Sequence, residues 1–245
     1  MSAPAARHGK LLLANAALFA LAWFLWDWKV MYPIKLLVVL MHESGHALAT
    51  VLTGGSVESI QLDPQQAGVT WSRGGWRLAI IPAGYLGSTA MGLVIFYCSH
   101  LRSIGRYLME AMGILIIVVL LWSVRDTFTI AFCALTAAAF LWIGLKDWPA
   151  VELPITRFIG ITSTLYALID IRDDLLHWTI PQYHSVAGST GKSDAQAMAE
   201  LIPLPAIFWG GLWALVSVVA LLWVLSRIVA IPPHRLLSLD DPPQK

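Results

Sequence analysis

Residues 35–49 read Lys35-Leu-Leu-Val-Val-Leu-Met-His42-Glu43-Ser44-Gly45-His46-Ala-Leu-Ala49, and this stretch decides what kind of fold the chain adopts. Most of its side chains are apolar, as in a helix that crosses a lipid bilayer, which needs ~20 mostly apolar residues. Three ionisable side chains, His42, Glu43 and His46, lie in the middle of it. Because an ionisable group is costly at membrane depth, such groups indicate a functional site.

The composition of the whole chain supports a membrane protein. Of the 245 residues, 58% are hydrophobic and 13% are charged, and the mean hydropathy is +0.69. Soluble domains have about 25% charged residues. We therefore exclude a soluble enzyme with one apolar helix, a disordered regulator and a secreted disulfide scaffold. The net charge of +1 gives no basis for a nucleic-acid partner, which would need a clustered basic face.

Apolar runs of membrane-spanning length recur along the chain. We predict an all-α polytopic membrane protein with about seven transmembrane helices. The expected spans are residues 11–26, 31–53, 78–99, 107–123, 127–145, 153–171 and 204–228.

A non-helical stretch at residues 55–77 directly follows the second expected span. Glycine pairs bound it, and a two-residue period between them is typical of short strands, in Glu58, Ile60 and Leu62 and again in Val69 and Trp71. We expect a small re-entrant β-hairpin with its turn near residues 63–68.

A polar loop is expected at residues 175–200. Within it, Ser193 stands three residues before Gln196, a spacing typical of a capping box that opens the last helix. The proline-rich residues 232–245 predict a mobile tail. No separate soluble domain is expected, so residues 1–245 are predicted to form a single transmembrane domain with a catalytic core at residues 31–175.

The ionisable group of residues 42–46 has the pattern H-E-x-x-H. On a helix His42 and His46 lie four residues apart on one face, close enough for both imidazoles to bind one metal ion. Glu43 lies beside the first ligand and can reach a metal-bound water without binding the metal itself. The pattern therefore predicts two zinc ligands and a general base.

Zinc catalysis requires three protein ligands and an open position for water. No other histidine or glutamate lies nearby in the sequence, so we expect the third ligand to come from another span. The sixth expected span offers Asp170 and, one turn later, Asp174. Asp170 is nearer the expected depth of the histidines and is flanked by apolar residues, which favours it. Asp174 is the alternative.

These residues resemble the site-2 protease family of intramembrane zinc metallopeptidases, and most closely its compact multi-pass branch without PDZ domains. The resemblance covers roughly residues 35–200 and rests on H-E-S-G-H, the glycine-rich hairpin and the small-residue helix after it. Residues 165–174 and Ser193-Asp194-Ala195 are also similar to family patterns. The capping box explains Ser193 locally, and an acidic residue in a helix's first turn is ordinary, so Asp194 is only a runner-up site.

The resemblance implies that His42, His46 and an aspartate bind Zn²⁺, and that Glu43 activates water to cleave a peptide bond within the membrane. The family carries its distal aspartate in an Asn-Pro…Leu-Asp-Gly context, whereas Asp170 here has neither the proline nor the glycine. The same resemblance leaves two roles open for the hairpin: its edge at Ile60, Leu62, Val69 and Trp71 would bind an extended substrate by β-augmentation, or the hairpin is a simple amphipathic connector. Small residues four apart in residues 82–92 predict close packing on the zinc-bearing helix.

The predicted function is therefore that of an intramembrane zinc metalloprotease. Its expected partners are a transmembrane protein or peptide substrate and the lipid bilayer, and its expected location is a cell membrane. Two alternatives belong to other classes: a non-proteolytic zinc-containing binder or chaperone of membrane segments, and a metal or proton transporter. A pure binder has no need of Glu43, and a transporter would more often show repeated halves.

Overall fold

The computed structural model describes residues 3–176 and 192–237; within residues 3–12 and 170–176 it describes only the backbone. Every apolar run predicted as a span is helical. The helices are α1 (Ala3–Leu25), α2 (Tyr32–Leu52), α3 (Arg77–Cys98), α4 (Leu108–Ser123), α5 (Thr127–Lys146), α6 (Pro149–Leu176), α7 (Asp194–Leu201) and α8 (Ala206–Val229).

The predicted number of spans is confirmed only in part. Within the described residues, five helical segments are long and apolar enough to cross a membrane: Lys29–Leu52, Arg77–Cys98, Gly105–Ser123, Thr127–Lys146 and Ala206–Val229. The two other predicted spans correspond to α1 and α6. The described apolar part of α1, Leu13–Leu25, is short.

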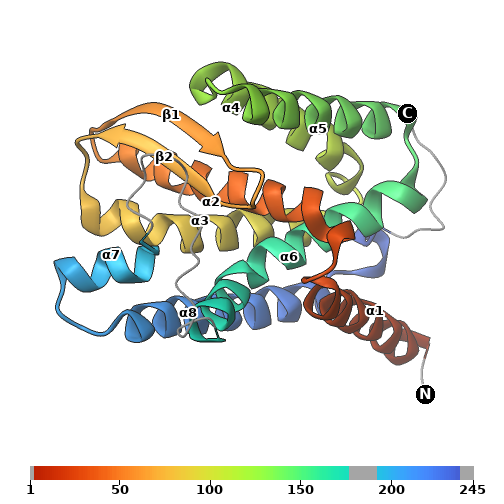
Figure 1. Cartoon of the computed structure of the whole chain (residues 1–245). Helices are drawn as coiled ribbons and strands as arrows, with labels where there is room; N and C mark the ends of the chain where they lie inside the picture. The colour runs from red at the N-terminus through yellow and green to blue at the C-terminus, as the bar shows by residue number, and fades with distance from the viewer. Residues whose placement is uncertain (1–2, 177–191, 238–245) are drawn as a thin grey trace.

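Helix α6 is more polar than these five segments, and much of its surface faces other helices instead of lipid. It packs against α1, α3 and α8 and crosses the middle of the molecule (Figure 1). Glu152, Thr156 and three consecutive hydroxyl residues, 162–164, are buried in it. Side chains that face protein need not be apolar, so hydropathy alone underestimates such a helix.

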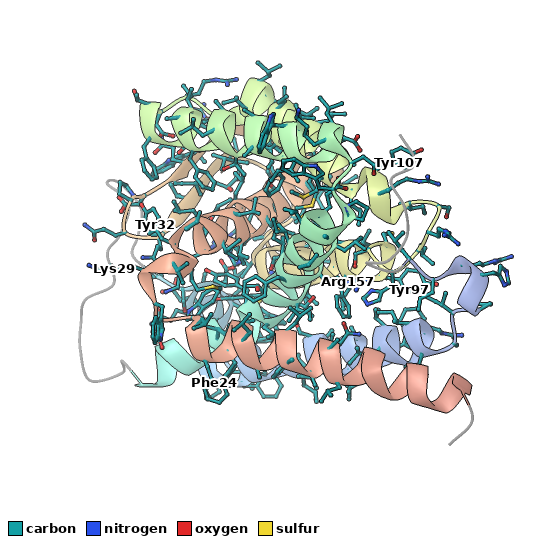
Figure 2. The ribbon with its side chains drawn as sticks, turned by 90° about the vertical axis from the view of Figure 1, so that its right-hand side faces the viewer. Phe24, Lys29, Tyr32, Tyr97, Tyr107 and Arg157 are labelled. Carbon is teal, nitrogen blue, oxygen red and sulfur yellow. The ribbon has the colours of Figure 1, made fainter. Side chains whose placement is uncertain are left out.

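The helices form two groups on either side of α2. One group is α3, α6 and α8, and the other is the antiparallel pair α4 and α5, which lies at the top of Figure 1. Helix α1 lies along the outside of the first group and turns Phe24 away from it (Figure 2). Helix α2 is therefore central, and most of its side chains between Leu36 and Ala47 are buried.

The small-residue stripe predicted on residues 82–92 packs on the zinc-motif helix, as expected. A Cβ added to Gly45 of α2 would lie 2.1 Å from the carbonyl oxygen of Ala83, so only glycine permits this approach. On its other side α3 meets α6, where a Cβ at Gly92 would lie 2.7 Å from the carbonyl oxygen of Gly160. Close contact of small residues is the usual way for helices to associate within a membrane.

The predicted β-hairpin is confirmed. Strands β1 (Ser56–Leu62) and β2 (Gly68–Arg73) form a two-stranded antiparallel sheet that pairs Leu62 with Gly68. Gln66 adopts a left-handed conformation in the turn, with φ of 70°. The hairpin lies over α2 (Figure 1).

The predicted capping box is present, but it opens a different helix from the one expected. Ser193 and Gln196 begin the short helix α7, and α8 starts anew at Ala206. Pro203 and Pro205 separate the two helices, because proline lacks the N–H that a continuous helix would need. The rest of the predicted polar loop, residues 177–191, lies outside the described residues.

The tail that the sequence predicts to be mobile begins with an ordered stretch. Residues Pro233–Arg235 form a 3-10 turn, and Leu236 forms an antiparallel bridge with Leu101 after α3. The guanidinium of Arg157 on α6 donates to the carbonyl oxygens of Ser99 and Leu237. Residues 238–245 of the predicted tail lie outside the described residues.

Candidate metal and catalytic site

The two histidines of the motif lie side by side on α2, as their spacing predicts. Both are largely buried, and their ring centroids are 4.7 Å apart with the planes nearly perpendicular. The Nε2 atoms of His42 and His46 are 3.1 Å apart. The two imidazoles thus point their distal nitrogens at one position.

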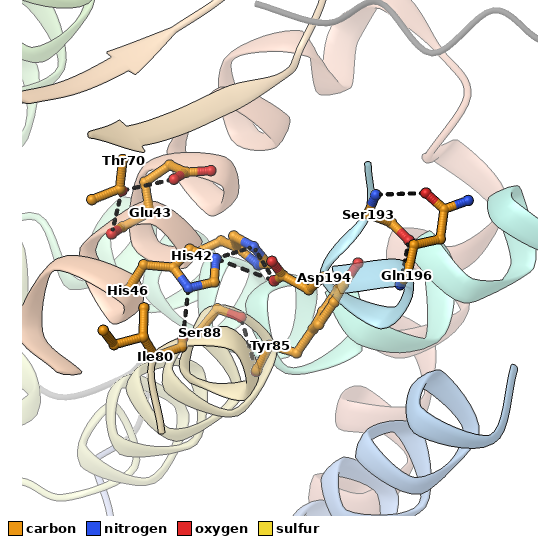
Figure 3. Close-up of polar contacts among 10 residues, drawn as sticks. All are labelled: His42, Glu43, His46, Thr70, Ile80, Tyr85, Ser88, Ser193, Asp194 and Gln196. Carbon is orange, nitrogen blue, oxygen red and sulfur yellow. Dashed lines mark hydrogen bonds and ion pairs between the residues drawn. The ribbon is translucent and has the colours of Figure 1, made fainter. Parts of the chain in front are cut away.

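A backbone contact fixes the orientation of His46. Its Nδ1 is 2.8 Å from the carbonyl oxygen of Ile80 at the start of α3 (Figure 3). Because a carbonyl oxygen only accepts hydrogen bonds, Nδ1 carries a proton, and Nε2 is the nitrogen that faces His42 and Asp194. This arrangement is the usual one for a metal-binding histidine, whose second nitrogen donates to a carbonyl or carboxylate.

A carboxylate completes the group. Oδ2 of Asp194, the first residue of α7, lies 3.1 Å from Nε2 of His42 and 3.1 Å from Nε2 of His46 (Figure 3). Burial alone would raise the pKa of the Asp194 carboxyl, but the adjacent imidazoles hold it well below its ordinary value. Three donor atoms from two distant parts of the chain therefore meet at one point.

The geometry of this group fits a metal ion such as zinc. In a tetrahedral site with bonds of ~2.0 Å, two ligand atoms lie ~3.3 Å apart, close to the observed 3.1 Å. The adjacent wall of the site is Gly84 of α3. A Cβ there would lie 2.4 Å from Nε2 of His42 and 2.5 Å from Nε2 of His46, so the absence of a side chain leaves space beside both nitrogens.

The sequence-based choice of third ligand rests on side chains outside the described residues. Asp170 and Asp174 lie near the end of α6, where only the backbone is described. Tyr166, one turn before Asp170, has its ring centroid 5.5 Å from that of His42, so α6 borders the site. Among the described residues, the group that could hold a metal is His42, His46 and Asp194.

Sequence reasoning identified Asp194 only as a runner-up. The capping box gave a sufficient local reason for an acidic residue at this position, and proximity in space to residues 42–46 is not visible in a single sequence. The one signal in the sequence that pointed to Asp194 is the similarity of Ser193-Asp194-Ala195 to the family pattern.

Glu43 lies between α2 and the hairpin and is 6% exposed. The Thr70 hydroxyl on β2 lies 2.7 Å from Glu43 Oε2 and 2.9 Å from the Glu43 backbone carbonyl oxygen, so it can donate to either acceptor (Figure 3). A Cβ added to Gly68 would lie 2.8 Å from Oε1 of Glu43. The hairpin therefore holds the carboxylate in place with one hydroxyl and one glycine.

Aromatic rings surround the histidines on the side away from the hairpin. The rings of Tyr85 and Tyr166 meet the His42 ring edge-on, at centroid distances of 4.8 and 5.5 Å. Trp213 of α8 stacks on Tyr85 at 5.4 Å. These rings form an apolar wall beside His42, and electrostatic interactions are stronger where the surroundings are apolar.

The chain matches one family model, described as Peptidase M50B-like, over residues 14–224. This match spans most of the chain and includes all the residues of the site. No curated protein sequence and no solved structure matches it.

Proposed function

Because this chain belongs to the Peptidase M50B-like family of site-2 proteases, and is an integral membrane peptidase on that basis, we propose that it is an intramembrane zinc metalloprotease. We propose His42, His46 and Asp194 as the zinc ligands and Glu43 as the general base. The observation that carries this proposal is the convergence of His42, His46 and Asp194 at 3.1 Å from one another. Asp170 remains the alternative third ligand that the sequence predicts.

The chemistry divides between the metal and the protein. When bound, zinc lowers the pKa of a water molecule to near neutrality and polarises a carbonyl group. Glu43 then accepts a proton from the attacking water and returns it to the leaving amine. The hydrogen bond from Thr70 orients this carboxylate, and the packing of Gly68 against it limits its other rotamers.

A substrate helix must become extended before its peptide bonds can be attacked, and the described residues leave one edge of the hairpin unpaired for this. The Asp63 N–H bonds to Ala67, so by the alternation of antiparallel pairs the backbone groups of residues 60, 62, 68 and 70 point outward. On β1 the outward backbone groups already have partners. The Leu62 N–H donates to the Thr129 hydroxyl, and Ile60 forms a parallel β-bridge with Val124.

The outward backbone groups of Gly68 and Thr70 on β2 have no hydrogen-bond partner within the part of the chain that the structure describes. These two residues are also the ones that contact Glu43. We therefore propose that the substrate pairs with β2, beside the general base. Among the hairpin residues predicted from the sequence to bind substrate, this proposal keeps Val69 and Trp71, which lie on β2. Ile60 and Leu62 on β1 instead anchor the hairpin to the rest of the protein.

The experiment that tests the function compares wild type with Glu43→Gln. Both proteins are expected to purify from detergent with one zinc per chain, because Glu43 is not a ligand. In cells that produce the wild type, new protein termini within transmembrane segments should appear; with Glu43→Gln they should be lost, since a general base contributes roughly 10²- to 10⁴-fold. Glu200→Gln on the exposed surface of α7 is the matched control.

The possible outcomes separate the proposed function from its alternatives. Identical sets of termini for the two proteins would overturn proteolysis and favour a binder of membrane segments. Zinc uptake into vesicles that contain the purified protein would favour a transporter. Capture of uncleaved membrane proteins by Glu43→Gln alone would support the protease and identify its substrates.

A further inference from the structure

The start of α7 is held by two reciprocal hydrogen bonds. The Gln196 N–H donates to Oγ of Ser193 at 3.4 Å, and the Ser193 N–H donates to Oε1 of Gln196 at 3.0 Å (Figure 3). Asp194 lies between these two residues and is the first residue of the helix. The path of the backbone from which the Asp194 side chain leaves is therefore set by the capping box.

Helix α7 is short, and few of its side chains are buried. It has eight residues, and a helix this short is not stable alone in water. Only Ala195 and Met198 are buried, in a cluster with Tyr85 and Trp213. Pro203 and Pro205 interrupt the helix between α7 and α8, so α7 is not a continuation of α8, although it packs against both α8 and α3.

We propose that the capping box of Ser193 and Gln196 is the positioning device of the metal site: it directs Asp194 at His42 and His46. This inference rests on the proposed zinc site. A ligand must be held within about 0.5 Å of its productive position. His42 and His46 are fixed by the long, buried helix α2, whereas Asp194 depends on a two-turn helix and its first hydrogen bonds.

The docking of α7 and the binding of zinc should each favour the other. If the capping box favours the docked position of α7, it raises zinc affinity, and bound zinc in turn stabilises docked α7 by the same free energy. We therefore expect zinc to slow hydrogen exchange at the backbone amides of residues 195–201. Without this coupling the cap would affect only the local helix.

The test measures zinc affinity of the full chain in detergent by competition with a chromophoric chelator. Gln196→Ala and Ser193→Ala should each weaken zinc binding by about tenfold, the effect expected when a ligand loses its supporting contact. Gln196→Glu and Ser193→Thr keep the capping pattern and should bind zinc nearly as wild type does. Gln196 is exposed, so its replacement leaves the core intact.

The matched control is Glu200→Ala. It removes the exposed ion pair between Glu200 on α7 and Lys192, which precedes the helix, without touching the capping box, and it should change zinc affinity less than about twofold. A larger loss in this control than in Gln196→Ala would overturn the inference, since general weakening of α7 would then explain both.

The remaining outcomes separate this inference from the proposed function. Tight zinc binding by wild type, its loss in Asp194→Ala and its full retention in Gln196→Ala would overturn the positioning role alone. Absence of zinc binding in wild type would overturn both. Rescue by Gln196→Glu, together with zinc-dependent protection of residues 195–201, supports the inference.

Discussion

Gly84 of α3 offers the sharpest test of the metal site, because a single methyl group there reaches both histidines. A Cβ at Gly84 would lie 2.4 Å from Nε2 of His42 and 2.5 Å from Nε2 of His46, whereas ordinary contacts begin at 3.4 Å. The imidazoles of Gly84→Ala must therefore retreat by about 1 Å, or α3 must move away from α2. Either change separates the nitrogens from Asp194.

The expected effect on zinc is large. Zinc–nitrogen bonds are ~2.0–2.1 Å and tolerate about 0.2 Å, so a displacement of about 1 Å removes a ligand. We expect zinc affinity in Gly84→Ala to fall by at least about 100-fold, which corresponds to about 2.7 kcal/mol. The cost to the fold itself should be smaller, about 1–3 kcal/mol for an overpacked methyl group.

The assay is chelator competition on the detergent-purified protein, with gel filtration and circular dichroism to verify the fold. Gly211→Ala on α8 is the matched control, since a Cβ there meets nothing within 4 Å and should leave zinc binding unchanged. A folded Gly84→Ala protein with wild-type zinc affinity would refute the convergence of the two imidazoles beside α3.

Three further predictions concern Asp194, Gly68 and His100. Asp194→Ala should lower zinc affinity by at least about 100-fold while Asp170→Ala leaves it near wild type; the reverse result in chelator competition would make Asp170 the ligand. Gly68→Ala should bring a methyl group to 2.8 Å from Oε1 of Glu43, and a displaced base should lower the cleavage rate by up to about 100-fold with unchanged zinc content. Burial, with a smaller contribution from a nearby arginine, lowers the pKa of His100 to about 3, so the folded state binds fewer protons than the unfolded state below pH ~6.5. As the pH is lowered from ~6.5 to ~3, the free energy of unfolding should therefore fall by up to about 1.4 kcal/mol per pH unit. Thermal unfolding of His100→Gln should show a flatter pH profile.

The helices were predictable from the sequence because hydropathy reports directly on contact with lipid. This held for α3, α4, α5 and α8, each of which has a face that remains apolar and exposed. It is less informative for α6, which faces other helices and buries Glu152 and several hydroxyl groups. The polarity of α6 depends on which helices surround it, and that depends on tertiary packing.

The first two members of the site were predictable because a helix converts sequence spacing into distance. His42 and His46 are neighbours on α2 whatever the rest of the chain does. The orientation of the Glu43 side chain could not be predicted from helix spacing. It depends on Thr70 and Gly68, which are distant in sequence and contact Glu43 only when the hairpin folds back over α2.

The sequence ranks Asp194 below Asp170 because the capping box gives Asp194 a sufficient local explanation. An acidic residue after an N-cap serine is favourable for the helix dipole, so the local sequence by itself does not mark Asp194 as a ligand. In the folded chain the two explanations are compatible: the cap orders the backbone at Ser193, and that order is what a ligand on the next residue requires. A ligand on a short capped helix is also less rigid than one on α2. The dependence of zinc affinity on Gln196 therefore tests whether the third ligand is set by local helix chemistry or by the docking of α7 as a whole.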